Sequence, residues 1–196
     1  GFVNADGSLS AEVKNSQLAC LDVIEAYAYS ILVDVFGDVP YTEALMGIDN
    51  LSPAYDDDAT IYASILADLT AAVTTLKGSS SMGNFGTSDI LYGGSTAHWA
   101  MFAASLKLRL AMRMADVSGS GSQAMVESVV NDVFGSNSDH AVLNYQSASP
   151  NTNPIWEDLV QSGRTDFIAS NTLADIMNAS NDPRRAMYFR NLGTGD

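Results

Sequence analysis

The chain is poor in the residue types from which catalytic and metal centres are most often built. Its 196 residues include one cysteine, Cys20, and two histidines, His98 and His140. A single cysteine cannot form an internal disulfide, and its place in an apolar helical pattern predicts a small buried side chain. One thiol and two distant histidines build neither a zinc site nor a nucleophile triad, and Gly-x-Ser-x-Gly and His-Glu-x-x-His motifs do not occur. The sequence therefore predicts no catalytic residue, no metal site and no cofactor.

Basic residues are also scarce. The chain has 9 Lys and Arg against 23 Asp and Glu, a formal net charge of -14 at pH 7. This charge repels nucleic-acid phosphates and anionic lipids, so nucleic acid is not an expected partner. No run of about 18 apolar residues is present to span a membrane, and Gly1–Asn4 has neither the basic nor the apolar region of a signal peptide. The hydrophobic fraction of 46% is nevertheless ample for the core of one domain.

Helical periodicity dominates the sequence. Apolar residues recur at helical spacing, with helix start and stop signals, at about residues 10–36, 58–76, 95–115, 122–134 and 170–180. No segment alternates convincingly as a strand does, although residues 89–94 fit a short extended piece before the third helix. These patterns predict an all-α fold of antiparallel helix pairs in a solenoid-like array with long loops.

The clearest helix end lies within residues 31–45. Large aliphatic residues precede it at helical spacing and are expected to face a core: Leu21, Ile24, Ala28, Ile31, Leu32 and Val35. Gly37 then fits a left-handed helix cap, while Pro40 lacks the N–H that a continuing helix needs and favours an extended Val39. Asp38 is expected to accept hydrogen bonds from nearby backbone N–H groups, with a ligand-facing role as the alternative.

The run FGDVPYTEAL, at residues 36–45, resembles the signature of the SusD/RagB family, surface lipoproteins that bind glycans in Bacteroidetes-type bacteria. Three further stretches resemble that family in the same order along the chain. They are residues 53–69 with PAYD, residues 99–113 with SLKLRLAMR, and residues 163–185 with GRTDF and NDPRR. One such block is a weak signal, but four ordered blocks make the resemblance specific.

The resemblance implies an all-α, tetratricopeptide-like superhelix with a non-catalytic role. It implies capture of oligo- or polysaccharide at the cell surface and transfer to a SusC-like TonB-dependent transporter in the outer membrane. Contact with the membrane is expected only through a lipid anchor, which residues 1–196 do not contain. Because proteins of this family are much longer, we expect one SusD-like helical domain, residues 1–196, truncated at both ends.

The resembling blocks also mark structural signature residues, namely Asp34, Phe36, Gly37, Asp38, Pro40, Trp99, Arg109, Arg113, Asp182 and Pro183. Arg109 and Arg113 lie four positions apart on one helix face, where they are expected to pair with carboxylates such as Asp34 or Asp38. Contact with an anionic ligand is the alternative for this arginine pair.

Tyr41, Tyr145 and Trp156 are the candidate glycan contacts. They lie in irregular stretches, where binding residues concentrate, and an aromatic face matches the apolar face of a sugar ring. The alternative for Trp156 is a packing role between helices.

Three other interpretations stay open. The acidic run Asp56–Asp58 fits a helix cap, but several carboxylates also suit Ca²⁺, although the glycine and distal glutamate of an EF-hand loop are missing. A helical-repeat scaffold that binds a protein or peptide is the alternative function. A glycoside hydrolase is the third, although no pair of carboxylates stands out for that chemistry.

Overall fold

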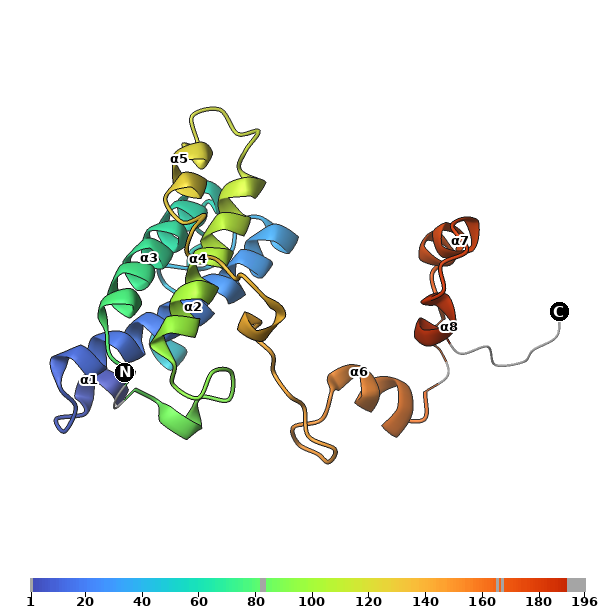
Figure 1. The fold of residues 1–196 in the computed structure, drawn as a ribbon, viewed down its shortest axis with the longest axis horizontal. Helices are drawn as coiled ribbons and strands as arrows, with labels where there is room; N and C mark the ends of the chain where they lie inside the picture. The colour runs from blue at the N-terminus through green and yellow to red at the C-terminus, as the bar shows by residue number, and fades with distance from the viewer. Residues whose placement is uncertain (1, 82–83, 165, 167, 190–196) are drawn as a thin grey trace. The chain divides into compact units, whose positions relative to one another are not determined.

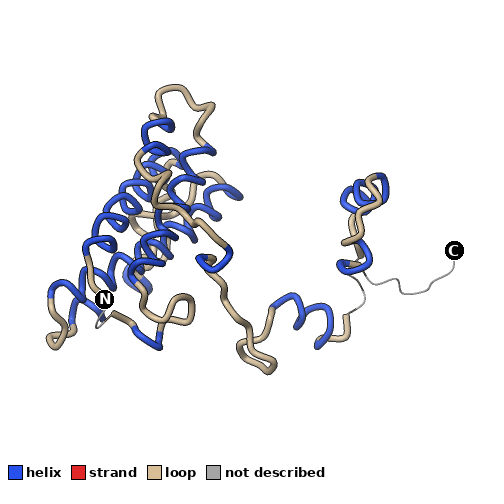
Figure 2. The backbone as a smooth tube through the Cα atoms, in the orientation of Figure 1, coloured by secondary structure: helices blue, strands red, loops and turns tan. Residues whose placement is uncertain are grey.

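The computed structural model describes residues 2–81, 84–164, 166 and 168–189. Within these residues the chain forms helices, turns and loops without a strand, as Figure 2 shows, and has one isolated antiparallel bridge between Val39 and Asp56. The predicted all-α class is therefore confirmed. The chain divides into two compact units, Gly1–Leu143 and Asn144–Asp196, and the expectation of a single domain stays a prediction.

The first unit holds the long helices. Its elements are α1 (Phe2–Ala5), α2 (Ala11–Phe36), α3 (Asp58–Gly78), α4 (Thr96–Arg113) and α5 (Ser122–Glu127), with 3₁₀ turns at Gly47–Asp49, Gly86–Ser88 and Asn137–Asp139. The second unit holds shorter elements, which are α6 (Pro154–Trp156), a π-helical turn (Glu157–Gln161), α7 (Asn171–Ala179) and α8 (Arg185–Tyr188).

Side-chain caps fix where the three long helices begin. In each one the capping oxygen accepts the N–H of the residue three positions later, and the caps are Ser10, Asp57 and Ser95. Such a cap stabilises a helix by about 0.5–2 kcal/mol, because it satisfies an N–H group that has no partner within the helix. The predicted starts at residues 10, 58 and 95 agree with these positions.

Helices α2, α3 and α4 lie side by side (Figure 1). The end of α2 meets the start of α3, where the Tyr62 hydroxyl donates to Asp34. The start of α2 meets the end of α3, where Ser80 N donates to Glu12 at 3.0 Å. Thr96, at the start of α4, likewise donates to the Ser79 carbonyl at 3.1 Å. Successive helices therefore run antiparallel, as the sequence predicts.

The core face of α2 is not the one that the large aliphatic residues predict. The face toward α3 and α4 is instead mostly small and β-branched, with Tyr29 and Gln17 as the larger members, and the buried residues are Ser16, Gln17, Ala19, Cys20, Val23, Ala26, Tyr29, Ser30 and Val33. The predicted face is solvent-exposed, with Val35 65% and Ile31 41% accessible. Small side chains let the neighbouring helices approach closely, so they occupy the contact even though the larger residues form an equally regular pattern.

The stripes on α3 and α4 pack as predicted. The largest fully buried side chains on these helices are Ile61, Ile65, Leu69, Leu76 and Leu110, while Phe102 is partly buried. By length and apolar composition α3 would suffice to cross a membrane, but its apolar stripe is buried against α2 and α4.

Two local predictions are wrong. The fourth helix ends at Glu127, not near residue 134, and the chain continues as turns in which Phe134 N donates to Ser105 Oγ at 2.9 Å. Residues 90–93 form a turn and not an extended piece, because the Asp89 carboxylate accepts the N–H groups of Leu91 and Tyr92. In both places a side-chain oxygen satisfies backbone groups that regular structure would otherwise satisfy.

Candidate functional site

The FGDVP turn ends α2 in a conformation that glycine favours. Gly37 has φ 74° and ψ -126°, so its φ is positive, but it does not adopt the predicted left-handed helical cap. Its N–H donates to Val33 O at 2.9 Å. Val39 is extended beside Pro40, as predicted, and accepts from Asp56 N at 3.0 Å. The Phe36 side chain is 70% exposed, so this signature residue is not part of the core.

A carboxylate holds the second half of the turn. Asp56 accepts Tyr41 N at 2.9 Å, Thr42 N at 3.0 Å and the Thr42 hydroxyl at 2.8 Å. The backbone hydrogen bonds from Thr42 and Tyr41 are the main cause of the lowered pKa of Asp56. The acidic residue of PAYD therefore closes the loop between α2 and α3.

The other acidic residues near the turn also serve the backbone. Asp38 Oδ1 accepts Asp58 N at 3.1 Å, so the expected backbone hydrogen bond is made across the loop and not within its own turn. Asp57 accepts Thr60 N at 3.1 Å as the helix cap. The carboxylates of Asp38, Asp57 and Asp58 lie within 4.8 Å of one another and are exposed. Two of these carboxylates thus accept backbone N–H groups, and the third lies in the first turn of α3, where a negative charge is favourable.

Tyr41 is fixed by the protein rather than left free for a ligand. Its hydroxyl lies 3.1 Å from Ser64 Oγ and donates to Asp68 at 3.4 Å. Its ring meets Tyr29 edge-on, with ring centroids 4.7 Å apart, and burial is the largest cause of the raised pKa of Tyr41. The ring therefore belongs to the packing between the turn, α2 and α3.

Asp34, Tyr62 and Arg113 join the three long helices. Arg113 Nη2 lies 3.0 Å from Asp34 Oδ1, and the Tyr62 hydroxyl donates to the same oxygen. Burial, and then the hydrogen bond to Asp34, raises the pKa of Tyr62. Arg109 is exposed and forms no ion pair among the described residues. The predicted arginine–carboxylate pairing therefore applies to Arg113 and Asp34 alone.

Trp99 anchors the start of α4. It is 4% exposed, and its Nε1 donates to Asp89 Oδ2 at 2.7 Å. The same carboxylate accepts Gly94 N at 2.8 Å, together with Leu91 N and Tyr92 N. Burial opposes ionisation of Asp89, but these hydrogen bonds outweigh it and lower its pKa. Asp89 was not among the predicted site residues; the signal in the sequence was an Asp four residues before the Gly93-Gly94 pair.

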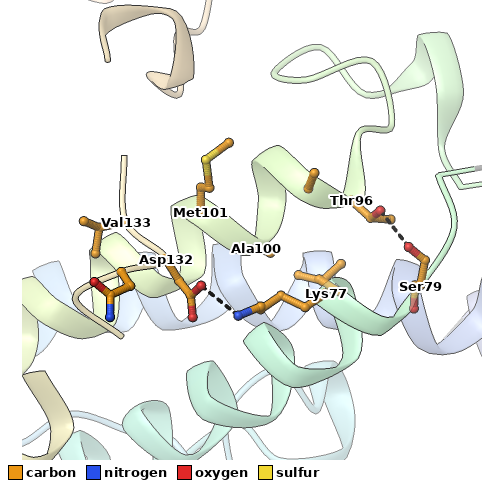
Figure 3. A pocket seen from close by; sticks show the side chains of 10 residues that line it. Lys77, Ser79, Thr96, Ala100, Met101, Asp132 and Val133 are labelled. Atoms are coloured by element: carbon orange, nitrogen blue, oxygen red, sulfur yellow. Dashed lines mark hydrogen bonds and ion pairs between the residues drawn. The ribbon is translucent and has the colours of Figure 1, made fainter. Parts of the chain in front are cut away.

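A groove of about 380 Å³ lies between the end of α3 and the start of α4 (Figure 3). Lys77 and Asp132 form an ion pair of 2.7 Å at one wall, while Ser79 and Thr96 line the other end. Its apolar lining comes from Leu76, Ala97, Ala100, Met101 and Val133. Ligand sites usually combine an apolar surface with a few polar groups, as this groove does. No aromatic ring is among its described lining residues.

The second unit carries the other two aromatic candidates. Tyr145 is 50% and Trp156 is 42% exposed, and no ring contact joins them within the described residues. The Asp182 carboxylate accepts Arg184 N at 2.9 Å and pairs with the Arg184 guanidinium, which lowers the pKa of Asp182 to about 2. Asp182 and Pro183 thus shape the turn before α8, while Tyr145 and Trp156 remain accessible to a ligand.

Antiparallel helix pairs, with a carboxylate-closed FGDVP turn between the first two long helices, define a SusD-like helical protein. The chain belongs to the SusD-like family described as "starch-binding associating with outer membrane", whose model matches residues 3–196. No curated protein sequence matches the chain.

Solved structures support this membership. A SusD homolog from Bacteroides uniformis is 28% identical, with a TM-score of 0.72 over 87% of this chain and 36% of its own. A SusD/RagB family protein from Bacteroides thetaiotaomicron is 30% identical, with a TM-score of 0.71; the match covers 87% of this chain and 34% of that protein. A chitin-binding protein is 28% identical, with a TM-score of 0.72; the match covers 94% of this chain and 38% of that protein. The chain therefore spans little more than a third of the length of these relatives.

Proposed function

We propose that this chain is part of a non-catalytic cell-surface protein that binds oligo- or polysaccharide. The observation that carries the proposal is the family match over residues 3–196, to a family described by starch binding and outer-membrane association. The similarity to a protein described as chitin-binding supports the same ligand class. The described carboxylates near the signature turn accept backbone N–H groups, which supports a structural role for them.

In this proposal the glycan is passed to a SusC-like TonB-dependent transporter, and the protein is held at the outer membrane by a lipid anchor. Tyr145 and Trp156 supply stacking faces, because both rings are accessible to solvent in the second unit. Tyr41 contributes less, since its ring and hydroxyl already have partners. Each contact is weak, so the expected dissociation constant is micromolar to millimolar, about 4–8 kcal/mol. Several sites along one polymer raise the overall affinity.

The test is calorimetric titration and native affinity electrophoresis of the polypeptide against starch, chitin oligosaccharides and a panel of plant and microbial glycans. Binding without release of shorter products, checked by chromatography, is the expected result. Co-purification from detergent-solubilised outer membranes tests the transporter as a partner. Turnover of any glycan would refute the non-catalytic assignment, and the absence of binding to every glycan would refute the ligand class.

A further inference from the structure

Helix α2 carries a second apolar face that residues 1–143 leave uncovered. This α2 stripe consists of Leu21, Ile24, Ala28, Ile31, Leu32 and Val35. Five of its members follow one another at intervals of three, four, three and four, the spacing at which one helix packs along another. The stripe runs from residue 21 to residue 35, which is about 21 Å at the rise of an α-helix.

The exposure of the stripe is unusual for side chains of this type. Leu21 is 47%, Ile24 40% and Val35 65% accessible, while the opposite face of the same helix is buried in the core. A helix that is apolar on both faces is typical of the interior of a protein, with a neighbour on each side. In unit 1, α3 and α4 supply the neighbours on one side only.

An apolar hollow continues the stripe at its N-terminal end. The hollow has a volume of about 360 Å³, and Leu21 and Ile24 belong to both it and the stripe. Its other apolar lining residues are Cys20, Phe85, Ile90, Leu91, Trp99 and Leu143. Asp89 also lines the hollow, but its carboxylate accepts the Trp99 and Gly94 N–H groups. The hollow therefore suits large apolar side chains at one end of a docked segment.

The edge of the stripe is acidic. Glu25 and Asp22 lie on α2 beside Leu21, and within the described residues no Lys or Arg forms an ion pair with them or with Asp68. Burial, and then the charges of Asp68 and Glu25, raises the pKa of Asp22, so this carboxylate lies among like charges. A basic residue on the docked segment would relieve that repulsion.

The occupant is better explained by more of the same polypeptide than by a second copy. Two copies meeting through this stripe would bring the acidic edges together, and each carries a net charge of -14. The solved relatives are longer, since the chain matches 34–38% of their length. We propose that the α2 stripe and its hollow dock an amphipathic helix supplied by the SusD-length polypeptide C-terminal to residue 196. That helix has at least about four turns, apolar residues at the same spacing, and Lys or Arg facing Asp22 and Glu25.

Thiol alkylation of the full-length polypeptide tests whether the stripe is covered. An Ile31→Cys variant is expected to react at least tenfold more slowly in the native than in the denatured state. The control is Ile48→Cys, because Ile48 is 90% exposed and lies outside the stripe. The native Cys20 gives little background in the folded protein, since burial raises its pKa to about 11, and its reaction in the denatured state is measured in the parent protein and subtracted. Native alkylation of Ile31→Cys at the denatured rate would overturn the proposal.

Photo-crosslinking identifies the occupant. A benzophenone amino acid replaces Ile31 in the full-length protein, and mass spectrometry then locates the crosslinked peptide. A crosslink within one monomer to a peptide beyond residue 196 is the expected result. The proposal would be overturned by a crosslinked dimer, by a crosslink to residues 1–196, by a crosslink to a different protein, or by the absence of any crosslink. A coding sequence that ends at residue 196 would do so as well.

Discussion

Asp34 and Arg113 connect the C-terminal ends of α2 and α4 through an ion pair of 3.0 Å, and Tyr62 of α3 donates to the same carboxylate oxygen. One carboxylate thus ties together the three long helices beside the turn that follows α2. Its neighbours in the sequence, Val33 and Val35, point into the core and into solvent respectively. The position therefore lies at the boundary where polar groups fix how the helices are aligned.

A double-mutant cycle with Asp34→Asn and Arg113→Gln measures this pair. We expect a coupling free energy of about 0.5–1 kcal/mol, because the Arg113 side chain is half exposed and solvent screens the pair. The measurement is denaturant unfolding of the four proteins. The control cycle pairs Asp34→Asn with Arg109→Gln, whose arginine is on the same helix but exposed, and it should show no coupling. Equal coupling in both cycles would argue against the specific pair.

Asp89→Asn is expected to destabilise the first unit by about 2–3 kcal/mol. The carboxylate accepts four hydrogen bonds, from Trp99, Gly94, Leu91 and Tyr92, and an amide turns one acceptor into a donor that faces N–H groups. The free energy of unfolding from denaturant titration is the readout. Asp116→Asn, at an exposed position, is the control and should change stability by less than about 0.5 kcal/mol.

The contribution of Asp89 should also depend on pH. Its pKa is lower in the folded protein than in the unfolded chain, where it is about 3.9. The stabilisation is therefore complete above that unfolded value and is lost as the pH falls from about 4 through the folded pKa. The difference in unfolding free energy between the native protein and Asp89→Asn should be constant from about pH 5 to 7 and shrink below about pH 4. A constant difference down to lower pH would contradict the role of the ionised carboxylate.

Gly94→Ala is expected to cost at least about 2 kcal/mol, the sum of backbone strain and a steric clash. Gly94 has φ +83°, and a Cβ there would lie 2.6 Å from Gly86 N, a backbone atom that cannot rotate away. Thermal and denaturant unfolding measure the loss. The matched control is Gly78→Ala at the end of α3, where a Cβ meets nothing within 4 Å and φ is not positive. This control should leave stability unchanged or slightly raised.

The sequence predicts helix positions better than it predicts which face of a helix is buried. Caps such as Ser10 and Asp57 are local signals, so the helix starts could be predicted from neighbouring residues alone. The buried face of α2 depends on which side α3 approaches, and a helix with two apolar faces contains no local signal for that choice. Periodicity favoured the larger residues, Leu21 and Ile31, whereas the core took Ala26 and Ser30.

The same limit applies to the candidate site. The roles of Gly37 and Pro40 follow from backbone chemistry and could be predicted, apart from the ψ of Gly37. Predicting the partner of Arg113 would require knowing a contact between residues 79 positions apart in the sequence. The choice between Asp34 and Asp38 depends on how the helices pack. The ion pair of Lys77 likewise could not be predicted from local sequence, because its partner Asp132 lies 55 residues away.

Trp156→Ala is expected to weaken glycan binding at least about fivefold, since truncating an aromatic contact commonly costs more than about 1 kcal/mol. The melting temperature should not change, because Trp156 is 42% exposed and has no ring contact among the described residues. Isothermal titration with the best glycan of the panel, alongside thermal unfolding, is the measurement. Ile155→Ala is the matched control, because Ile155 is the adjacent residue and is 66% exposed.

Weaker binding in the tryptophan variant alone would assign a stacking face to Trp156. Unchanged affinity, with the same result for Tyr145→Ala, would exclude both rings as contacts and leave the groove beside Lys77 and Asp132 as the next position to test.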